Sequence, residues 1–179
     1  MDSREKKLLL KHKISSIWGW LELGDLSSAE EEASDLQFDE LSQPESIDIF
    51  YEISRKKESW KDCVHYGEEL TRVSPADPGT WVRLCNALFW SGQAGMARDL
   101  ATQKIKEFPE EWDLVYNLAC YLTKLKSFDA AVDALQKAAR ISPNKEYFEA
   151  QAVLDSDLKP LWDHLGMSGT QFFKSSDIV

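Results

Sequence analysis

Three prolines recur along this chain at one interval of 34 residues: Pro75, Pro109 and Pro143. A fixed period of this length is typical of stacked helix-turn-helix units, because one such unit cannot bury its own apolar face and needs neighbours. The chain is therefore predicted to be an array of helix pairs. An array of this kind presents a surface to another molecule.

Other residues follow the same period. Leu84 maps onto Leu118, Leu88 onto Leu122, and Ala97 onto Ala131. Within one unit, an apolar stripe at the i, i+3, i+4 and i+7 positions of a helix is formed by Trp81, Leu84, Cys85 and Leu88. Gly92 is expected to end this helix, and the small Ala97 lets a second helix approach closely. Proline then follows each second helix because it cannot continue one.

This pattern resembles the tetratricopeptide repeat. The unit that starts at Trp81 and runs through Ala97 to Pro109 carries the motif. The next unit matches it more closely, with Leu118, Ala119, Leu122, Phe128, Ala131, Leu135, Ala138 and Pro143. The resemblance implies an all-α helical-repeat solenoid with about four helix pairs and a C-terminal capping helix.

We expect a single repeat domain over residues 1–166. Its repeats are predicted at 44–77, 78–111 and 112–145, after a degenerate repeat at 10–43 whose stripe of Ile14, Ile17, Trp18 and Leu21 has slipped by one residue. Residues 146–166 are predicted to form capping helices, the first with a stripe of Tyr147, Ala150 and Leu154. A flexible tail is expected over 167–179.

The charge is concentrated in one segment. The chain carries a net charge of -10. Residues 14–54 contain no lysine or arginine, and their acidic residues are Glu22, Asp25, Glu30, Glu31, Glu32, Asp35, Asp39, Glu40, Glu45, Asp48 and Glu52. This balance disfavours binding to nucleic acid, which needs a basic surface. Two interpretations stay open for the segment: attraction of a basic partner, or a solvated helix face that keeps the protein in solution.

No group of residues indicates catalysis. The three histidines, His12, His65 and His164, are scattered, and no glycine-rich phosphate loop is present. The cysteines have no zinc-binding spacing. Cys63 and Cys85 are expected to be packing residues, whereas Cys120 falls away from the main stripe and is expected to be a partly exposed thiol. We therefore predict no enzyme activity, no catalytic residues, no metal and no cofactor.

The apolar runs are short. None reaches the length of a membrane span, so no membrane association is expected. The run Leu8 to Leu10 near the start is too short for a signal peptide. The expected compartment is therefore the cytoplasm.

The helix faces opposite the core stripe are the candidate binding surface. Counting 100° per residue places Arg83, Asn86 and Trp90 on that face of one helix. In tetratricopeptide proteins this face lines the concave groove, so the resemblance implies a peptide-binding groove lined by Arg83, Asn86, Trp90, Tyr116, Asn117 and Lys124. The alternative is that Trp90 packs on the N-terminal unit or on the final helix.

The family's carboxylate clamp is not expected here. Asn86 and Asn117 fall where its two asparagines would lie, but Val82 replaces a lysine, and Tyr147 and Gln151 replace a basic pair.

The predicted function is a non-catalytic adaptor or scaffold that binds a protein or peptide segment in the groove. Two alternatives stay open: a dedicated chaperone for one client, similar to those of bacterial secretion systems, and a self-associating structural unit, for example a homodimer.

Overall fold

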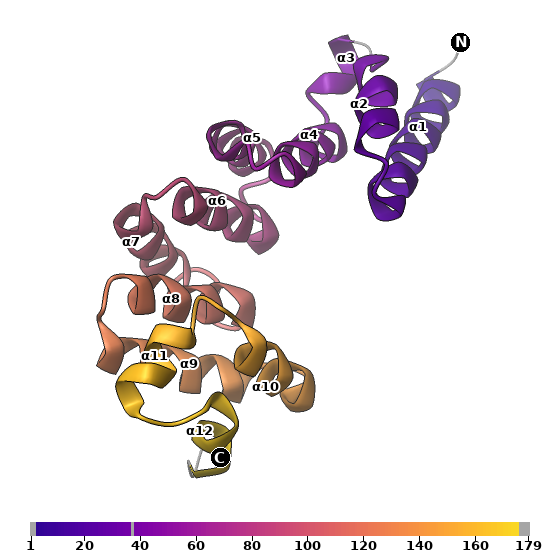
Figure 1. Ribbon diagram of the computed structural model, residues 1–179. Helices are drawn as coiled ribbons and strands as arrows, with labels where there is room; N and C mark the ends of the chain where they lie inside the picture. Colours follow the sequence, from indigo (N-terminus) through magenta and orange to yellow (C-terminus); the bar gives the residue numbers. More distant parts are fainter. Residues whose placement is uncertain (1–2, 37, 176–179) are drawn as a thin grey trace. The chain divides into compact units, whose positions relative to one another are not determined.

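The computed structural model describes residues 3–36 and 38–175. These residues form twelve α-helices and contain no β-strand (Figure 1). The prediction of an all-α fold is confirmed. The chain divides into two compact units, Met1–Thr80 and Trp81–Val179, and each is described by itself. None of the helices in the described ranges combines the length and apolar character needed to cross a lipid bilayer.

The first unit contains an apolar core shared by its first helices. Its helices are α1 (Ser3–Leu23), α2 (Leu26–Ser34), α3 (Phe38–Leu41), α4 (Pro44–Lys56) and α5 (Trp60–Val73), and α6 (Pro78–Trp90) begins at its end. Helix α1 packs on α2 and α4, and α4 packs on α5. The core that joins α1, α2 and α4 consists of Ile17, Leu21, Ala29, Ala33, Leu36, Ile49 and Ile53.

The second unit continues the helix pairs. After α6 come α7 (Ala94–Lys104), α8 (Trp112–Lys124), α9 (Phe128–Ile141), α10 (Lys145–Leu154), α11 (Lys159–Leu165) and α12 (Gly169–Ser175). Helix α8 packs on both α7 and α9. In the expected stripe of α6, Leu84, Cys85 and Leu88 are buried, which confirms that this face belongs to the core.

A left-handed residue marks the turn inside each of the first four helix pairs. Gly24, Glu58, Gly92 and Lys126 have φ values of 78°, 55°, 85° and 60°. These four positions lie 34 residues apart, from α1–α2 through to α8–α9. The turn of the degenerate first repeat is therefore in phase with the later ones, although its apolar stripe has slipped.

The hydrogen bonds at these turns repeat in the same way. The N–H group of the residue after each left-handed position bonds to a carbonyl five residues earlier: Asp25 to Trp20, Ser59 to Ser54, Gln93 to Leu88 and Ser127 to Leu122, at 2.8 to 2.9 Å. This 6→1 bond is the Schellman motif, which satisfies a carbonyl that the end of the helix would leave unpaired. Each first helix thus ends in one geometry, whether or not glycine is present.

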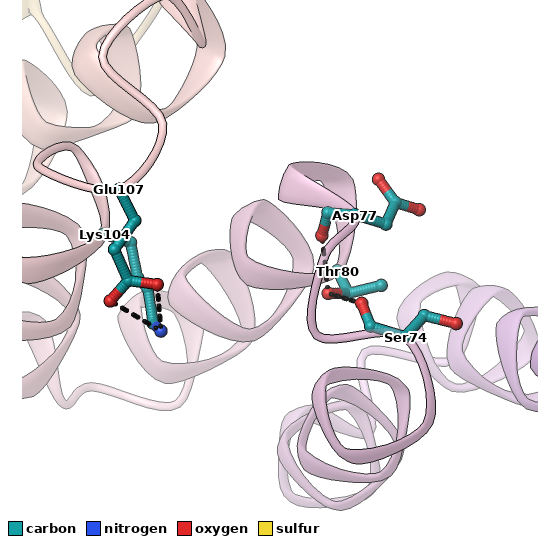
Figure 2. Close-up of polar contacts among 5 residues, drawn as sticks. All are labelled: Ser74, Asp77, Thr80, Lys104 and Glu107. Atoms are coloured by element: carbon teal, nitrogen blue, oxygen red, sulfur yellow. Dashed lines mark hydrogen bonds and ion pairs between the residues drawn. The ribbon is translucent and has the colours of Figure 1, made fainter.

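The helix after the first repeat proline starts with a local cap. Thr80 is buried, and its Oγ1 donates to the carbonyl oxygens of Ser74 at 3.2 Å and Asp77 at 2.8 Å (Figure 2). The Asp77 carboxylate accepts from the N–H of Gly79 at 2.9 Å. These bonds fix the connection from α5 into α6 and satisfy backbone groups at the helix start.

Lys104 occupies a core position of the repeat. One period away on either side stand Leu70 and Ala138, and both are buried. Lys104 is itself only 8% exposed. Its Nζ lies 3.0 Å from both carboxylate oxygens of Glu107 (Figure 2) and 3.6 Å from the centre of the Trp81 ring. The ion pair and the cation–π contact compensate the charge in an apolar position.

Part of the acidic segment makes contacts within the first unit. Glu32 accepts hydrogen bonds from Trp20 Nε1 at 2.7 Å and from Ser16 at 2.8 Å, which join α2 to α1. Glu30 pairs with Lys57 at 2.5 Å. Two of the three consecutive glutamates therefore have partners within the unit, and Glu31 is the exposed one.

The end of the described chain is anchored by aromatic side chains. Helix α12 lies within the segment expected to be a flexible tail, and it packs on α10. Phe172 is buried with its ring centre 5.3 Å from that of Trp162. A Cβ atom on Gly169 would lie 3.1 Å from the Trp162 ring and 3.2 Å from the backbone of Val153, so glycine allows the close approach.

Candidate peptide-binding face

The three residues of α6 that were predicted to face a ligand differ in solvent exposure. Trp90, at the end of the helix, exposes 36% of its surface, and Arg83 and Asn86 are half-buried. Tyr121 of α8 donates its hydroxyl to Oδ1 of Asn86 at 2.6 Å, and its ring lies 5.0 Å from that of Phe89. The Asn86 carbonyl is therefore used inside the fold, and its amide N–H₂ is the group oriented to donate elsewhere.

Tyr116, also predicted to face a ligand, is buried inside the unit. Its ring makes edge contacts with Trp112 and Phe148. Its hydroxyl donates to Oδ2 of Asp155 at 2.6 Å. Burial raises the pKa of the Tyr116 hydroxyl, and Cys120 and Asp155 raise it further, so the group stays a neutral donor. Tyr116 positions Asp155 instead of presenting a ring.

Cys120 shares the same carboxylate. Its sulfur lies 3.7 Å from Oδ2 of Asp155, and the residue is 4% exposed. The expectation of a partly exposed thiol was therefore wrong. Cys120 belongs to the second buried face of α8, which the single-stripe pattern does not include. Burial raises its pKa well above the ordinary range of a thiol.

The remaining predicted residues lie on α8. Asn117 is half-buried and Lys124 is exposed. Burial raises the pKa of Asp157, the charge of Asp155 adds to this, and the charge of Lys124 opposes it. Lys124 is thus close enough to act on the segment that follows α10. Tyr116, Lys124 and the end of α10 therefore belong to one region of the second unit.

Helix α10 exposes two large apolar side chains. Tyr147 is 61% exposed and Leu154 is 84% exposed, whereas Phe148 and Ala152 form the buried face. The predicted stripe of Tyr147, Ala150 and Leu154 therefore lies on the exposed face of the helix. The i, i+4 pair of Phe148 and Ala152 is the signal that could have identified the correct face.

These exposed residues surround a shallow hollow of about 430 Å³. It is lined by Tyr147, Ala150, Gln151, Leu154 and Asp155. Asp155 is the residue that Tyr116 holds, so the hollow adjoins the α8 residues. The sequence pattern did not predict this hollow. We use the name inner face for the candidate binding surface of Asn86, Trp90, Asn117, Lys124, Tyr147, Gln151 and Leu154.

The described residues contain no cluster of three or more histidine, cysteine or acidic side chains that could hold a metal. All three cysteines are free and buried. Burial raises the pKa of Cys85 to about 12 and that of Cys63 to about 11. These thiols are protonated at neutral pH, so they are packing groups, as the sequence predicts for both.

Comparison with known proteins indicates the fold. No family model matches the sequence, and no curated protein matches it either. MamA from Desulfovibrio magneticus RS-1 is 16% identical over 94% of this chain and 97% of that chain, with a TM-score of 0.67. TTC0263, a thermophilic TPR protein in Thermus thermophilus, is 16% identical over 88% of this chain and 83% of that chain, with a TM-score of 0.67.

A third solved structure is that of YrrB, described as a TPR protein with an unusual peptide-binding site. It is 12% identical over 93% of this chain and 87% of that chain, with a TM-score of 0.59. The three likenesses extend over most of each chain, and the helix pairs repeat every 34 residues, as the sequence predicts. The chain therefore has the tetratricopeptide-repeat fold.

Proposed function

We propose that this protein is a non-catalytic adaptor that binds a segment of another protein along the inner face. The observation that carries the proposal is the exposure of Tyr147 and Leu154 beside the hollow on α10. Large apolar side chains gathered at a hollow mark interaction sites on soluble proteins. The tetratricopeptide fold and the peptide-binding site described for YrrB support a peptide or protein as the ligand.

The polar groups of the inner face suit a peptide backbone. The amides of Asn86, Asn117 and Gln151 can donate to carbonyl groups and accept from N–H groups, which is a sequence-tolerant contact. Apolar anchors of the ligand would pack on Tyr147, Leu154 and Trp90. Lys124 lies beside Asp157, which reduces its attraction for a carboxylate, so we propose binding inside a chain and not capture of a free C-terminus.

The compartment proposed for this function is the cytoplasm. The three cysteines are free and buried, which fits a reducing compartment.

Affinity capture from native cells with mass spectrometry tests the proposal. The wild-type chain is compared with a Trp90→Ala, Asn117→Ala double variant and with Met96→Ala, which removes an exposed apolar side chain from α7 outside the inner face. We expect the double variant to lose the partners that the wild type and Met96→Ala retain. Equal capture by all three proteins would contradict the assignment.

Calorimetry on a captured partner then separates binding from folding. Truncation of Trp90 is expected to cost roughly 2 kcal/mol or more of affinity, as for buried aromatic anchors, with little change in urea unfolding. If Trp90→Ala unfolds the protein, the residue belongs to the core. If only Glu22→Gln, Glu31→Gln loses the partner, the acidic segment is the site. Both glutamates are exposed, so their neutralisation leaves the contacts of Glu30 and Glu32 intact.

A further inference from the structure

The first half of α1 carries apolar side chains that its own unit does not bury. Leu8 is 57% exposed, Leu9 is 45% exposed, and Leu10 is half-buried. Among the residues of α1 whose burial is described, the first buried one is Ile17. A helix gains most of its stability from packing of its apolar face, so the exposed Leu8 and Leu9 indicate a surface that a partner covers.

A groove runs along two of these leucines, Leu9 and Leu10. It has a volume of about 820 Å³ and lies between α1 and the segment from α3 to the start of α4. Leu9, Leu10, Ile14 and Pro44 give it an apolar floor. Leu10 and Ile14 also pack against the core of the first unit, so the floor continues a rigid part of that unit. We call this surface the α1 groove.

The α1 groove is basic although the chain is acidic. Lys6, Lys7, Lys11 and Lys13 line it from α1, and Glu40 and Glu45 line it from the other side. Four positive and two negative charges give a local excess of two positive charges in a chain whose net charge is -10. Lys13 pairs with Glu40 at 2.9 Å, so the exposed Lys7 and Lys11 form the basic edge.

We propose that the α1 groove binds an amphipathic helix of another protein that carries acidic residues beside its apolar face. The floor accepts leucine-like side chains, and the lysine edge pairs with the partner's carboxylates. An anionic membrane fits less well, because Glu40 and Glu45 line the opposite wall. This site is in the first unit and is separate from the inner face of the second.

The experiment uses the full chain and three designed helical peptides. All three share one leucine face, and their polar positions are filled with glutamate, glutamine or lysine. Binding is measured by fluorescence anisotropy and located by methyl chemical shifts. We expect the glutamate peptide to bind about tenfold more tightly than the lysine peptide, to weaken with salt, and to shift Leu9, Leu10 and Ile14.

Two charge reversals of equal size locate the site. Lys7→Glu, Lys11→Glu removes the basic edge, whereas Lys56→Glu, Lys61→Glu changes two lysines of the same unit outside the groove. We expect the first pair to weaken the glutamate peptide about tenfold and the second to change binding less than about twofold. Circular dichroism checks that both variants keep their helices, and Trp90→Ala should leave this binding unchanged.

Several results would overturn the proposal. These are failure of the glutamate peptide to bind, equal binding of the lysine peptide, or methyl shifts outside the groove. Binding to anionic vesicles that Lys7→Glu, Lys11→Glu abolishes would assign the groove to a membrane surface instead. A dimer that the same variant dissociates in sedimentation would assign it to a second copy of the chain.

Discussion

The hydroxyl of Tyr116 donates to Oδ2 of Asp155 at 2.6 Å and connects α8 to the residue that ends α10, 39 positions later in the chain. Tyr116 is buried and Asp155 is half-buried. Asp155 also lines the hollow on α10. One side chain of the candidate site is therefore held in place from inside the fold.

Removal of this hydroxyl should destabilise the second unit. Tyr116→Phe keeps the ring contacts but removes one donor from the Asp155 carboxylate, which retains the N–H of Asp157 at 2.8 Å. A hydrogen bond to a charged group contributes about 2 kcal/mol. We expect a loss of this size in urea unfolding. Tyr147→Phe is the control, because it removes an exposed hydroxyl and should change stability by less than about 0.5 kcal/mol. If Tyr116→Phe leaves the free energy of unfolding unchanged, the hydrogen bond does not contribute to stability.

The close approach at Gly169 gives a second prediction. Gly169→Ala places a methyl group 3.1 Å from Trp162 and 3.2 Å from the backbone of Val153, so α12 must shift. We expect a loss of about 1 to 2 kcal/mol, as for overpacking, and faster proteolysis after Lys174. Gly19→Ala in α1 meets nothing within 4 Å and should instead stabilise by up to about 1 kcal/mol. If proteolysis after Lys174 is as slow in Gly169→Ala as in the wild type, the prediction is wrong.

The buried Lys104 gives a third prediction. A leucine stands at the equivalent position of the preceding pair, and an apolar residue of similar volume avoids the cost of burying a charge. Lys104→Leu should therefore be neutral or stabilising in urea unfolding. Glu107→Gln leaves the lysine charge without its carboxylate and should destabilise, by about 1 kcal/mol or less because Glu107 is half exposed. If Lys104→Leu lowers the free energy of unfolding more than Glu107→Gln does, this interpretation is excluded.

The repeat could be predicted from the sequence because it depends on residues that recur by type. Pro75, Pro109 and Pro143 give the period, and the stripe of α6 identifies its core face. The position of Tyr116 could not be predicted, because the ring of Phe148 and the carboxylate of Asp155 that it contacts both come from the capping segment. Lys104 was missed for a similar reason: its partners Trp81 and Glu107 become visible only when the helices are packed.

The candidate site was less predictable than the core. On α10, polar and apolar residues alternate so that two stripes are available, and packing against α9 and α12 selects Phe148 and Ala152 as the buried one. That choice exposes Tyr147 and Leu154. The assignment of Arg83, Asn86, Trp90, Asn117 and Lys124 to a ligand remains a proposal.

The buried thiol of Cys85 predicts a pH dependence. Its pKa is raised by burial from 9.0 to about 12, so the unfolded chain loses this proton first as the pH rises. The contribution of the protonated Cys85 thiol to the free energy of unfolding is fully present below pH 9.0 and is lost as the pH rises towards about 12. By about pH 10 the loss is about 1 kcal/mol. Cys85→Ala, which copies Ala119 of the next repeat, should lose less stability in urea unfolding as the pH is raised over this range. Parallel pH profiles for the two proteins would contradict the assignment.

The four left-handed turns give a prediction for the repeat itself. Glu58 and Lys126 adopt φ values of 55° and 60°, where a side chain costs about 1 to 2 kcal/mol, whereas Gly24 and Gly92 hold the same position without that cost. Glu58→Gly and Lys126→Gly should therefore each stabilise by about 0.5 to 1 kcal/mol, after allowance for the greater freedom of glycine in the unfolded chain. Urea unfolding measures the gain. Lys126→Ala is the control, because it removes the charge but keeps the Cβ atom, and it should give no such gain. Gly92→Ala should destabilise by about 1 kcal/mol or more. If Lys126→Ala stabilises as much as Lys126→Gly, charge and not backbone conformation accounts for the effect at this turn.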